Sequence, residues 1–231
     1  SLIGERTRGV IVNSPNNPSG VVYDRVTLAR IAACLTARSR EIGHSIYLIS
    51  DEPYRELVYG AAEVPYVPSL YPETVVCYSF SKSYSLPGDR IGYVLTPPTC
   101  PRAAELLRAV AGAARTLGHV CAPALMQRVV GAVPDARPDI AFYDRNRRAL
   151  MQALSDLGYA YVTPEGAFYL LLRAPGGDAV AFSDRAKREG LLIVPCDGFG
   201  LPGFVRLAYC VAPAVIRRAV TILERIRQDL Q

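Results

Sequence analysis

The chain has 231 residues, half of them hydrophobic, and a formal net charge of +5 at pH 7. This length allows one large domain or two small ones. The apolar runs are short and interrupted, and none reaches the ~18 residues of a membrane-spanning helix, so we expect no membrane partner. The positive charge is spread along the chain without a dense basic block, so we expect no nucleic-acid partner.

The six cysteines are scattered along the chain without a Cys-x-x-Cys pair, and only two histidines accompany them. This composition predicts no familiar metal site. The scattered cysteines are most simply explained as reduced thiols, and the first residues of the chain do not resemble a secretory signal. We therefore expect a cytoplasmic protein.

The first half of the chain predicts a mainly parallel sheet. Three short apolar runs, each followed by polar turn residues, predict buried strands over residues 9–12, 45–50 and 74–78. Apolar residues recur at helical spacing over residues 27–40. A helix suits this connection because parallel strands need a long crossover. A fourth strand and two further helices are predicted over residues 91–95, 101–115 and 122–130.

The second half predicts a smaller α+β region. The predicted strands cover residues 159–162, 169–172, 191–194 and 205–209, and the predicted helices cover residues 138–157, 179–189 and 213–229. The fold class is therefore α/β, with a mainly parallel sheet in residues 1–137 and a small C-terminal α+β domain in residues 138–231.

Polar motifs follow the first three predicted strands directly. The loop 13–20 follows the first strand, Asp51 and Tyr54 follow the second, and Ser79 and Lys82 follow the third. Ligands of open α/β sheets bind outside the carboxyl ends of the strands. We therefore expect the three motifs to converge at one edge of the sheet.

Lysine is rare in this chain. Only Lys82 and Lys187 are lysines, and arginine supplies the rest of the 26 basic residues. Arginine stays protonated and cannot bond to an aldehyde as a primary amine can. A lysine among small hydroxyl residues, in the run Ser79–Arg90, is therefore consistent with a position that needs an amine.

In this order and spacing, the motifs resemble the class I/II aminotransferases of fold type I, which depend on pyridoxal 5'-phosphate (PLP). The resemblance extends from about Arg8 to the last helix. It implies that Asn17 and Tyr54 contact the phenolic oxygen of PLP and that Asp51 pairs with its protonated ring nitrogen. It also implies that Lys82 bonds covalently to the cofactor and then moves a proton as general base.

The same resemblance assigns the remaining positions. Ser79 and Arg90 match phosphate ligands, and Ser81 matches a neighbour of the phosphate. Arg206 matches the arginine that grips the substrate α-carboxylate with two parallel hydrogen bonds, and Asn17 also borders the substrate. The segment Gly166–Tyr169 matches the turn and strand beside the substrate.

Each of these residues also has an ordinary explanation when taken alone. Asn, Pro and Gly favour turns, and most lysines and arginines face solvent. Asp51 alone fits a solvated acid after a strand, and Tyr54 alone fits half-buried packing. The joint pattern of Asn17, Asp51, Tyr54, Ser79, Lys82 and Arg90 would require six coincidences, so we favour a site.

The resemblance implies an amino-acid aminotransferase that moves an amino group from an amino acid to a 2-oxo acid and works as a homodimer. Two alternatives remain open: a PLP-dependent β-lyase or synthase of the same fold, and the aminotransferase-like sensor domain of a transcriptional regulator. The sequence does not identify the amino-acid donor or the oxo-acid acceptor.

Intact members of the family carry a long segment before the asparagine loop, whereas this chain reaches the loop within twenty residues. We therefore expect an N-terminally truncated fragment that lacks a phosphate-binding loop and helix N-terminus. Such a fragment is expected to bind PLP weakly or not at all and to have negligible activity alone.

Overall fold

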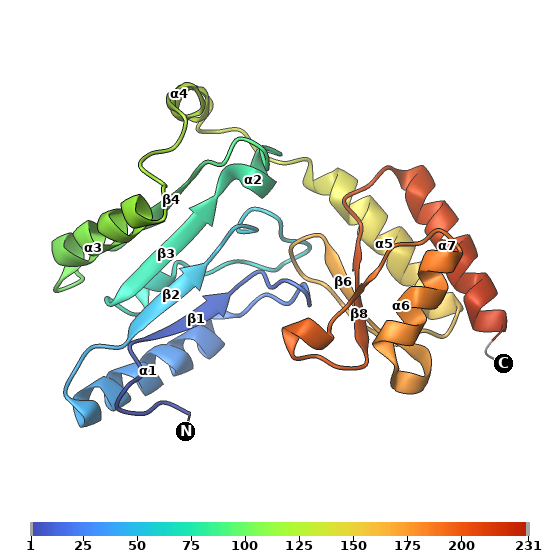
Figure 1. Ribbon diagram of the computed structural model, residues 1–231, viewed down its shortest axis with the longest axis horizontal. Helices are drawn as coiled ribbons and strands as arrows, with labels where there is room; N and C mark the ends of the chain where they lie inside the picture. The colour runs from blue at the N-terminus through green and yellow to red at the C-terminus, as the bar shows by residue number, and fades with distance from the viewer. Residues whose placement is uncertain (1, 230–231) are drawn as a thin grey trace. The chain divides into compact units, whose positions relative to one another are not determined.

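The computed structural model describes residues 2–229, and these fall into two compact units. The first unit contains residues 1–14, 23–56 and 63–138, and the second contains residues 15–22, 57–62 and 139–231. Figure 1 gives the labels of the helices and strands used below. No helix in the described residues is both long and apolar enough to cross a bilayer.

The first unit is built on a four-stranded sheet with strand order β1-β2-β3-β4. Its strands are β1 (Gly9–Asn13), β2 (Tyr47–Asp51), β3 (Thr74–Ser79) and β4 (Gly92–Leu95). The first three strands are parallel, and β4 runs antiparallel to β3. The prediction of a mainly parallel sheet is therefore confirmed.

Helix α1 (Arg25–Ile42) connects β1 to β2 and covers one face of the sheet, as Figure 1 shows. Leu28 and Leu35 of this helix are buried against Ile46 and Leu48. The Asp24 carboxylate caps its first turn by accepting a hydrogen bond from the Thr27 amide at 2.7 Å. The other end of the helix closes on Gly43 in the left-handed conformation, with a φ of 73°.

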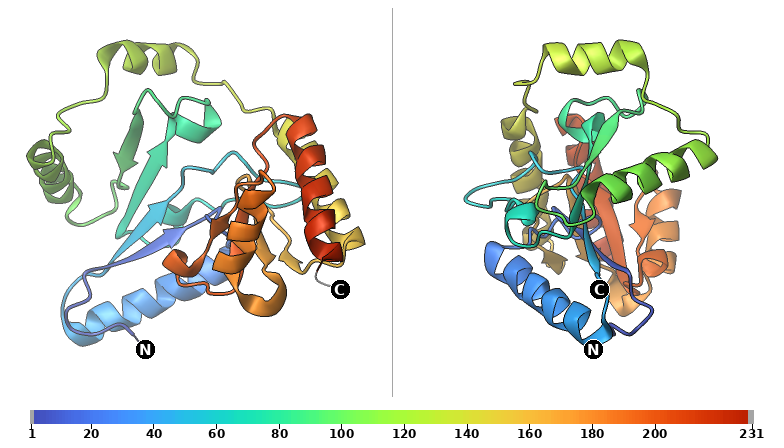
Figure 2. Two further views of the ribbon diagram at one scale, coloured as in Figure 1. Left: turned by 45° about the vertical axis from the view of Figure 1, so that its right-hand side comes forward. Right: turned by 90° about the vertical axis from the view of Figure 1, so that its left-hand side faces the viewer.

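The remaining elements of this unit are shorter or more exposed. They are the 3-10 helix η1 (Val67–Ser69) and the helices α2 (Phe80–Ser83), α3 (Ala103–Thr116) and α4 (Ala124–Ala132). Helices α3 and α4 contain no buried residue within the described part of the chain. In the left view of Figure 2 both helices stand apart from the sheet, on the side of β4.

The second unit has an antiparallel sheet with strand order β5-β6-β8-β7. Its elements are α5 (Ile140–Asp156), β5 (Tyr161–Val162), β6 (Tyr169–Arg173), η2 (Pro175–Gly177), α6 (Ala179–Arg188), β7 (Val194–Pro195), η3 (Asp197–Phe199), β8 (Phe204–Ala208) and α7 (Pro213–Gln228). Leu170 and Leu172 of the central strand β6 are fully buried. Helices α5 and α7 pack side by side.

Two segments from the first half of the sequence belong to this second unit, and they hold the turn before β6. The Gly20 carbonyl accepts hydrogen bonds from the Glu165 and Gly166 amides, each at 2.8 Å. The Tyr59 hydroxyl donates to the Ala167 carbonyl at 2.5 Å, and Ala167 is left-handed with a φ of 58°. These hydrogen bonds hold Ala167 in the left-handed conformation, which is higher in free energy for alanine than for glycine.

The predicted helices and strands are present, but two strands are shorter than predicted and one helix was missed. Leu191 begins no strand because its amide bonds to the Ala186 carbonyl at the end of α6, and β7 is only Val194–Pro195. The Tyr159 amide likewise bonds back to the Leu154 carbonyl, which delays β5 to Tyr161. The short helix α2 was not predicted. Its start depends on a single capping hydroxyl that sequence periodicity does not reveal.

Gly20 provides a test of this packing. Its φ is +72°, and an added Cβ would lie 2.4 Å from the Pro164 Cβ and 2.9 Å from the Tyr169 carbonyl oxygen. We expect Gly20→Ala to lower the free energy of unfolding by at least about 3 kcal/mol, because strain and overlap with neighbouring atoms add. The matched control Gly43→Ala has the same φ but open space, so it should cost only about 1 kcal/mol. Urea denaturation measures both, and equal losses would contradict this account.

Candidate active site

The carboxyl ends of β1, β2 and β3 meet at one edge of the first sheet. Asn13 is paired in register with Asp51, and Asp51 is paired with Cys77, two residues before Ser79. We call Asn13, Asp51, Ser79, Ser81 and Lys82 the rim cluster. The parallel pairing thus brings together the predicted residues that follow the second and third strands.

Asp51 is held by a neutral neighbour. The Asn13 side-chain amide donates to a carboxylate oxygen of Asp51 at 3.0 Å and to its main-chain carbonyl at 3.1 Å. Burial raises the pKa of Asp51 above its ordinary value, and the Asn13 hydrogen bond opposes this shift. No basic side chain forms an ion pair with Asp51 among residues 2–229.

Ser79 ends β3 and starts α2. Its hydroxyl accepts a hydrogen bond from the Ser81 amide at 3.2 Å and donates to the Ser81 hydroxyl at 2.9 Å. The Tyr78 hydroxyl donates to the Ser83 hydroxyl at 2.8 Å, which fixes the far end of the short helix. Lys82 is the third residue of α2 and is half-buried, so the helix places its backbone directly after Ser79 and Ser81.

Arg90 lies in the loop that returns to β4. The Phe80 amide bonds to the Ile91 carbonyl at 3.1 Å, and this bond places the backbone next to Arg90 beside the start of α2. The Arg90 side chain is exposed and donates to the Pro87 carbonyl of its own loop at 2.8 Å. Its φ is 52°, a left-handed conformation that is uncommon for a residue other than glycine.

The turn after Asp51 is fixed by a buried acid. Glu52 is 2% exposed, accepts a hydrogen bond from the Ser50 hydroxyl at 2.7 Å and forms an ion pair with Arg55. Arg55 also donates to the Val64 carbonyl at 3.1 Å. Tyr54 lies within this turn and is 4% exposed. The turn that carries Asp51 and Tyr54 is therefore held by a paired and satisfied charge.

The second unit contains a separate group of predicted residues. Arg206 of β8 donates a hydrogen bond from Nη1 to the Asn17 side-chain oxygen at 2.9 Å. Its guanidinium carbon lies 4.5 Å from the centre of the Tyr169 ring and 5.4 Å from the centre of the Phe199 ring. We call Asn17, Tyr169, Phe199 and Arg206 the Arg206 cluster.

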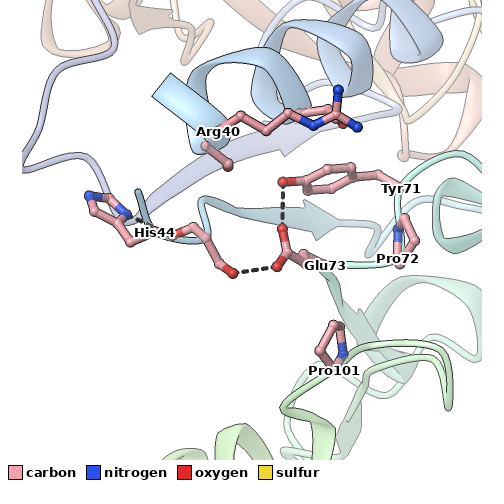
Figure 3. Close-up of a pocket in the computed structure, with 9 residues that line it drawn as sticks. Arg40, His44, Tyr71, Pro72, Glu73 and Pro101 are labelled. Atoms are coloured by element: carbon pink, nitrogen blue, oxygen red, sulfur yellow. Dashed lines mark hydrogen bonds between the residues drawn. The ribbon is translucent and has the colours of Figure 1, made fainter. Parts of the chain in front are cut away.

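A cavity of about 440 Å³, drawn in Figure 3, is lined by Ser45 and Glu73, which lie just before β2 and β3 and therefore at the end of the first sheet opposite the rim. Glu73 lines it and accepts hydrogen bonds from the Ser45 hydroxyl and, at 2.9 Å, from the Tyr71 hydroxyl. Burial, followed by the Glu73 carboxylate, raises the pKa of Tyr71 to about 12. The Glu73 carboxylate is thus already hydrogen-bonded within the chain. Because the cavity lies at the amino ends of β2 and β3, it is separate from the rim cluster.

The structure brings Asp51, Ser79, Ser81 and Lys82 together in the first unit, and Asn17 and Arg206 together in the second. That both groups form one site stays a prediction. Sequence reasoning missed two contacts. Asn13 could be found only from the register of β1 against β2, and Phe199 only from the fold of the loop before β8.

Asp51→Asn tests the electrostatic state of the rim. Because the pKa of Asp51 is raised in the folded chain, its charge lowers stability as the pH rises from 3.8 through the folded pKa. We expect Asp51→Asn to be more stable than the wild type at pH 7, with the difference vanishing below pH 3.8. Asp135→Asn, at an exposed position, serves as the control. Urea denaturation across this pH range checks the prediction, and a lower stability of Asp51→Asn at pH 7 would contradict it.

Comparison with known proteins identifies the family of the chain. The model of the family "Aminotransferase class I and II" matches residues 1–223. The structure superposes on an aminotransferase from Eubacterium rectale with a TM-score of 0.95 and 48% identity, covering 100% of this chain and 58% of the other. An aspartate aminotransferase structure from Thermotoga maritima matches with a TM-score of 0.80 and 28% identity, covering 97% and 58%.

A curated relative agrees with these structures. A probable aspartate/prephenate aminotransferase from Aquifex aeolicus is 31% identical over 99% of this chain and 59% of its own length. The chain therefore spans somewhat more than half the length of the relatives that it matches. The α/β fold and its aminotransferase type are confirmed. With nearly its whole length matched by the family model, the chain belongs to the class I and II aminotransferases.

Proposed function

We propose that the protein is a PLP-dependent aminotransferase that moves an amino group from an amino acid to a 2-oxo acid. Class I and II aminotransferases use pyridoxal phosphate. The observation that carries the proposal is the register of β1, β2 and β3, which places a carboxylate, two hydroxyls and a lysine at one sheet edge. The names of the relatives favour transfer over elimination.

The residues of the rim fit this cofactor. Asp51 is a half-buried carboxylate beside a neutral amide, so a protonated ring nitrogen would supply the opposite charge that it lacks. Ser79 and Ser81 offer hydroxyl groups to a phosphate, and the backbone next to Arg90 lies beside the start of the same short helix, so we propose its guanidinium as a further phosphate ligand. When bound, the cofactor supplies an electron sink for the substrate carbanion.

Lys82 is proposed as the covalent attachment point and as the base that moves the proton at the substrate Cα. Tyr54, which is buried after Asp51, is proposed to contact the phenolic oxygen of the cofactor together with Asn17. Arg206 is proposed to hold the α-carboxylate of the substrate, with Asn17 beside it. We propose that residues 1–137 form part of the large PLP-binding domain and that residues 138–231 form the small domain.

The relatives are named for aspartate, prephenate and aromatic amino acids. We propose substrates that are α-amino acids and the corresponding 2-oxo acids, since a carboxylate next to the reacting carbon is common to all of these compounds. We further propose a homodimer and a cytoplasmic location. Within the described residues no disulfide joins any of the six cysteines, which supports a reducing compartment.

Reductive trapping tests the proposed attachment point. The chain is incubated with millimolar PLP and reduced with borohydride, and its peptides are mapped by mass spectrometry. We expect pyridoxyl-Lys82, because trapping accumulates even a weakly populated adduct. The matched variants are Lys82→Arg, which should lose the label, and Lys187→Arg, which should keep it. Labelling of Lys187 equal to or above that of Lys82 would contradict the proposal.

Substitution of Arg90 separates stability from cofactor binding. Both Arg90→Gly and Arg90→Ala remove the guanidinium, so each should weaken PLP binding about tenfold or more. Glycine tolerates the φ of 52° better than alanine, so Arg90→Gly should be at least as stable as Arg90→Ala. PLP titration by absorbance and urea denaturation measure the two effects. Unchanged PLP binding in both variants would remove Arg90 from the phosphate site.

A further inference from the structure

Arg206 has more hydrogen-bonding capacity than the chain uses. A guanidinium has five N–H donors. Among residues 2–229, the Asn17 oxygen is the hydrogen-bond acceptor for Arg206, and no acidic side chain forms an ion pair with it. The side chain is half-buried, so its charge is partly removed from water without compensation from a carboxylate. Such a group favours an anion that brings its own acceptors.

Two aromatic rings contact this guanidinium. Tyr169 of β6 is paired with Ala208, two residues beyond Arg206 on β8, so the sheet itself places the tyrosine ring diagonally against the arginine. Phe199 comes from outside the sheet, in the loop between β7 and β8, and is 47% exposed. A ring attracts the cation through its face and uses none of the N–H donors.

The loop that carries Phe199 is closed by its own hydrogen bonds. The Phe199 and Leu201 amides donate to the Cys196 carbonyl at 2.9 and 3.0 Å, and the Cys196 amide donates to the Phe204 carbonyl at 2.8 Å. Gly200 adopts the left-handed conformation that the turn needs, with a φ of 73°. Cys196 is fully buried and anchors the turn against the sheet. A half-exposed ring is thus held over Arg206 by a built turn.

We infer that Phe199 is a positioning residue that orients the Arg206 guanidinium for a carboxylate. This inference rests on the proposed role of Arg206 and extends it to a residue outside the sheet. The Phe199 ring lies against the guanidinium and takes up none of its N–H donors. Phe199 therefore raises the affinity of Arg206 for a carboxylate, and the effect is the same for every substrate that carries a carboxylate.

The test uses propanoate as a minimal carboxylate and propanamide as its uncharged counterpart. The Nε–H signal of Arg206 is followed by NMR in arginine-labelled chain and is assigned by its loss in Arg206→Lys. We expect propanoate, and not propanamide, to shift this signal. Phe199→Leu should weaken propanoate binding about 2- to 5-fold, the range of an exposed cation–π contact, whereas Phe199→Tyr should retain it. Tyr66→Leu, at a similarly exposed aromatic position, should have no effect.

Propanoate binding that is equal in wild type and Phe199→Leu, or no response to propanoate, would overturn the inference. If PLP labels Lys187 as strongly as Lys82 while propanoate binding depends on Phe199, the inference stands and the proposed role of Lys82 fails.

Discussion

The parallel pairing of β1, β2 and β3 is the constraint on which the rim depends. The register of β1 against β2 places Asn13 opposite Asp51, and the register of β2 against β3 places Asp51 opposite Cys77. A slip by one residue would turn Asp51 to the other face of the sheet and would separate its carboxylate from the Asn13 amide. The burial of α1 against Ile46 and Leu48 fixes this register, because those side chains must face the helix. Core packing at one face therefore determines the polar arrangement at the edge.

The second unit depends on a comparable constraint at the turn before β6. The left-handed Ala167 has its carbonyl bonded by Tyr59 and, at 3.3 Å, by Tyr209. Burial raises the pKa of Tyr59 to about 12, so its hydroxyl remains a donor over the whole physiological range. The turn leads directly into Tyr169, whose ring contacts Arg206. Segments distant in sequence thus fix the start of the strand that borders the carboxylate group.

Much of this architecture could be predicted from the sequence. Apolar runs gave the strand positions, and polar residues after them located Asp51, Ser79 and Lys82 at one sheet edge. The partners of these residues could not be predicted. Asn13 becomes a neighbour of Asp51 only through register, and Phe199 reaches Arg206 only through a turn whose hydrogen bonds follow no periodic pattern. Tertiary contacts of this kind carry no local signal.

The charged residues of the chain are held in two different ways. Glu52 is paired with Arg55, and Arg147 is paired with Asp144 at 2.7 Å, so these charges are satisfied internally and fix the backbone. Asp51 and Arg206 are held instead by the neutral amides of Asn13 and Asn17, and in the case of Arg206 by aromatic rings. A neutral neighbour orients a charge without cancelling it. The charge then stays available to an incoming cation or anion, which is the property that a binding site requires and a structural ion pair lacks.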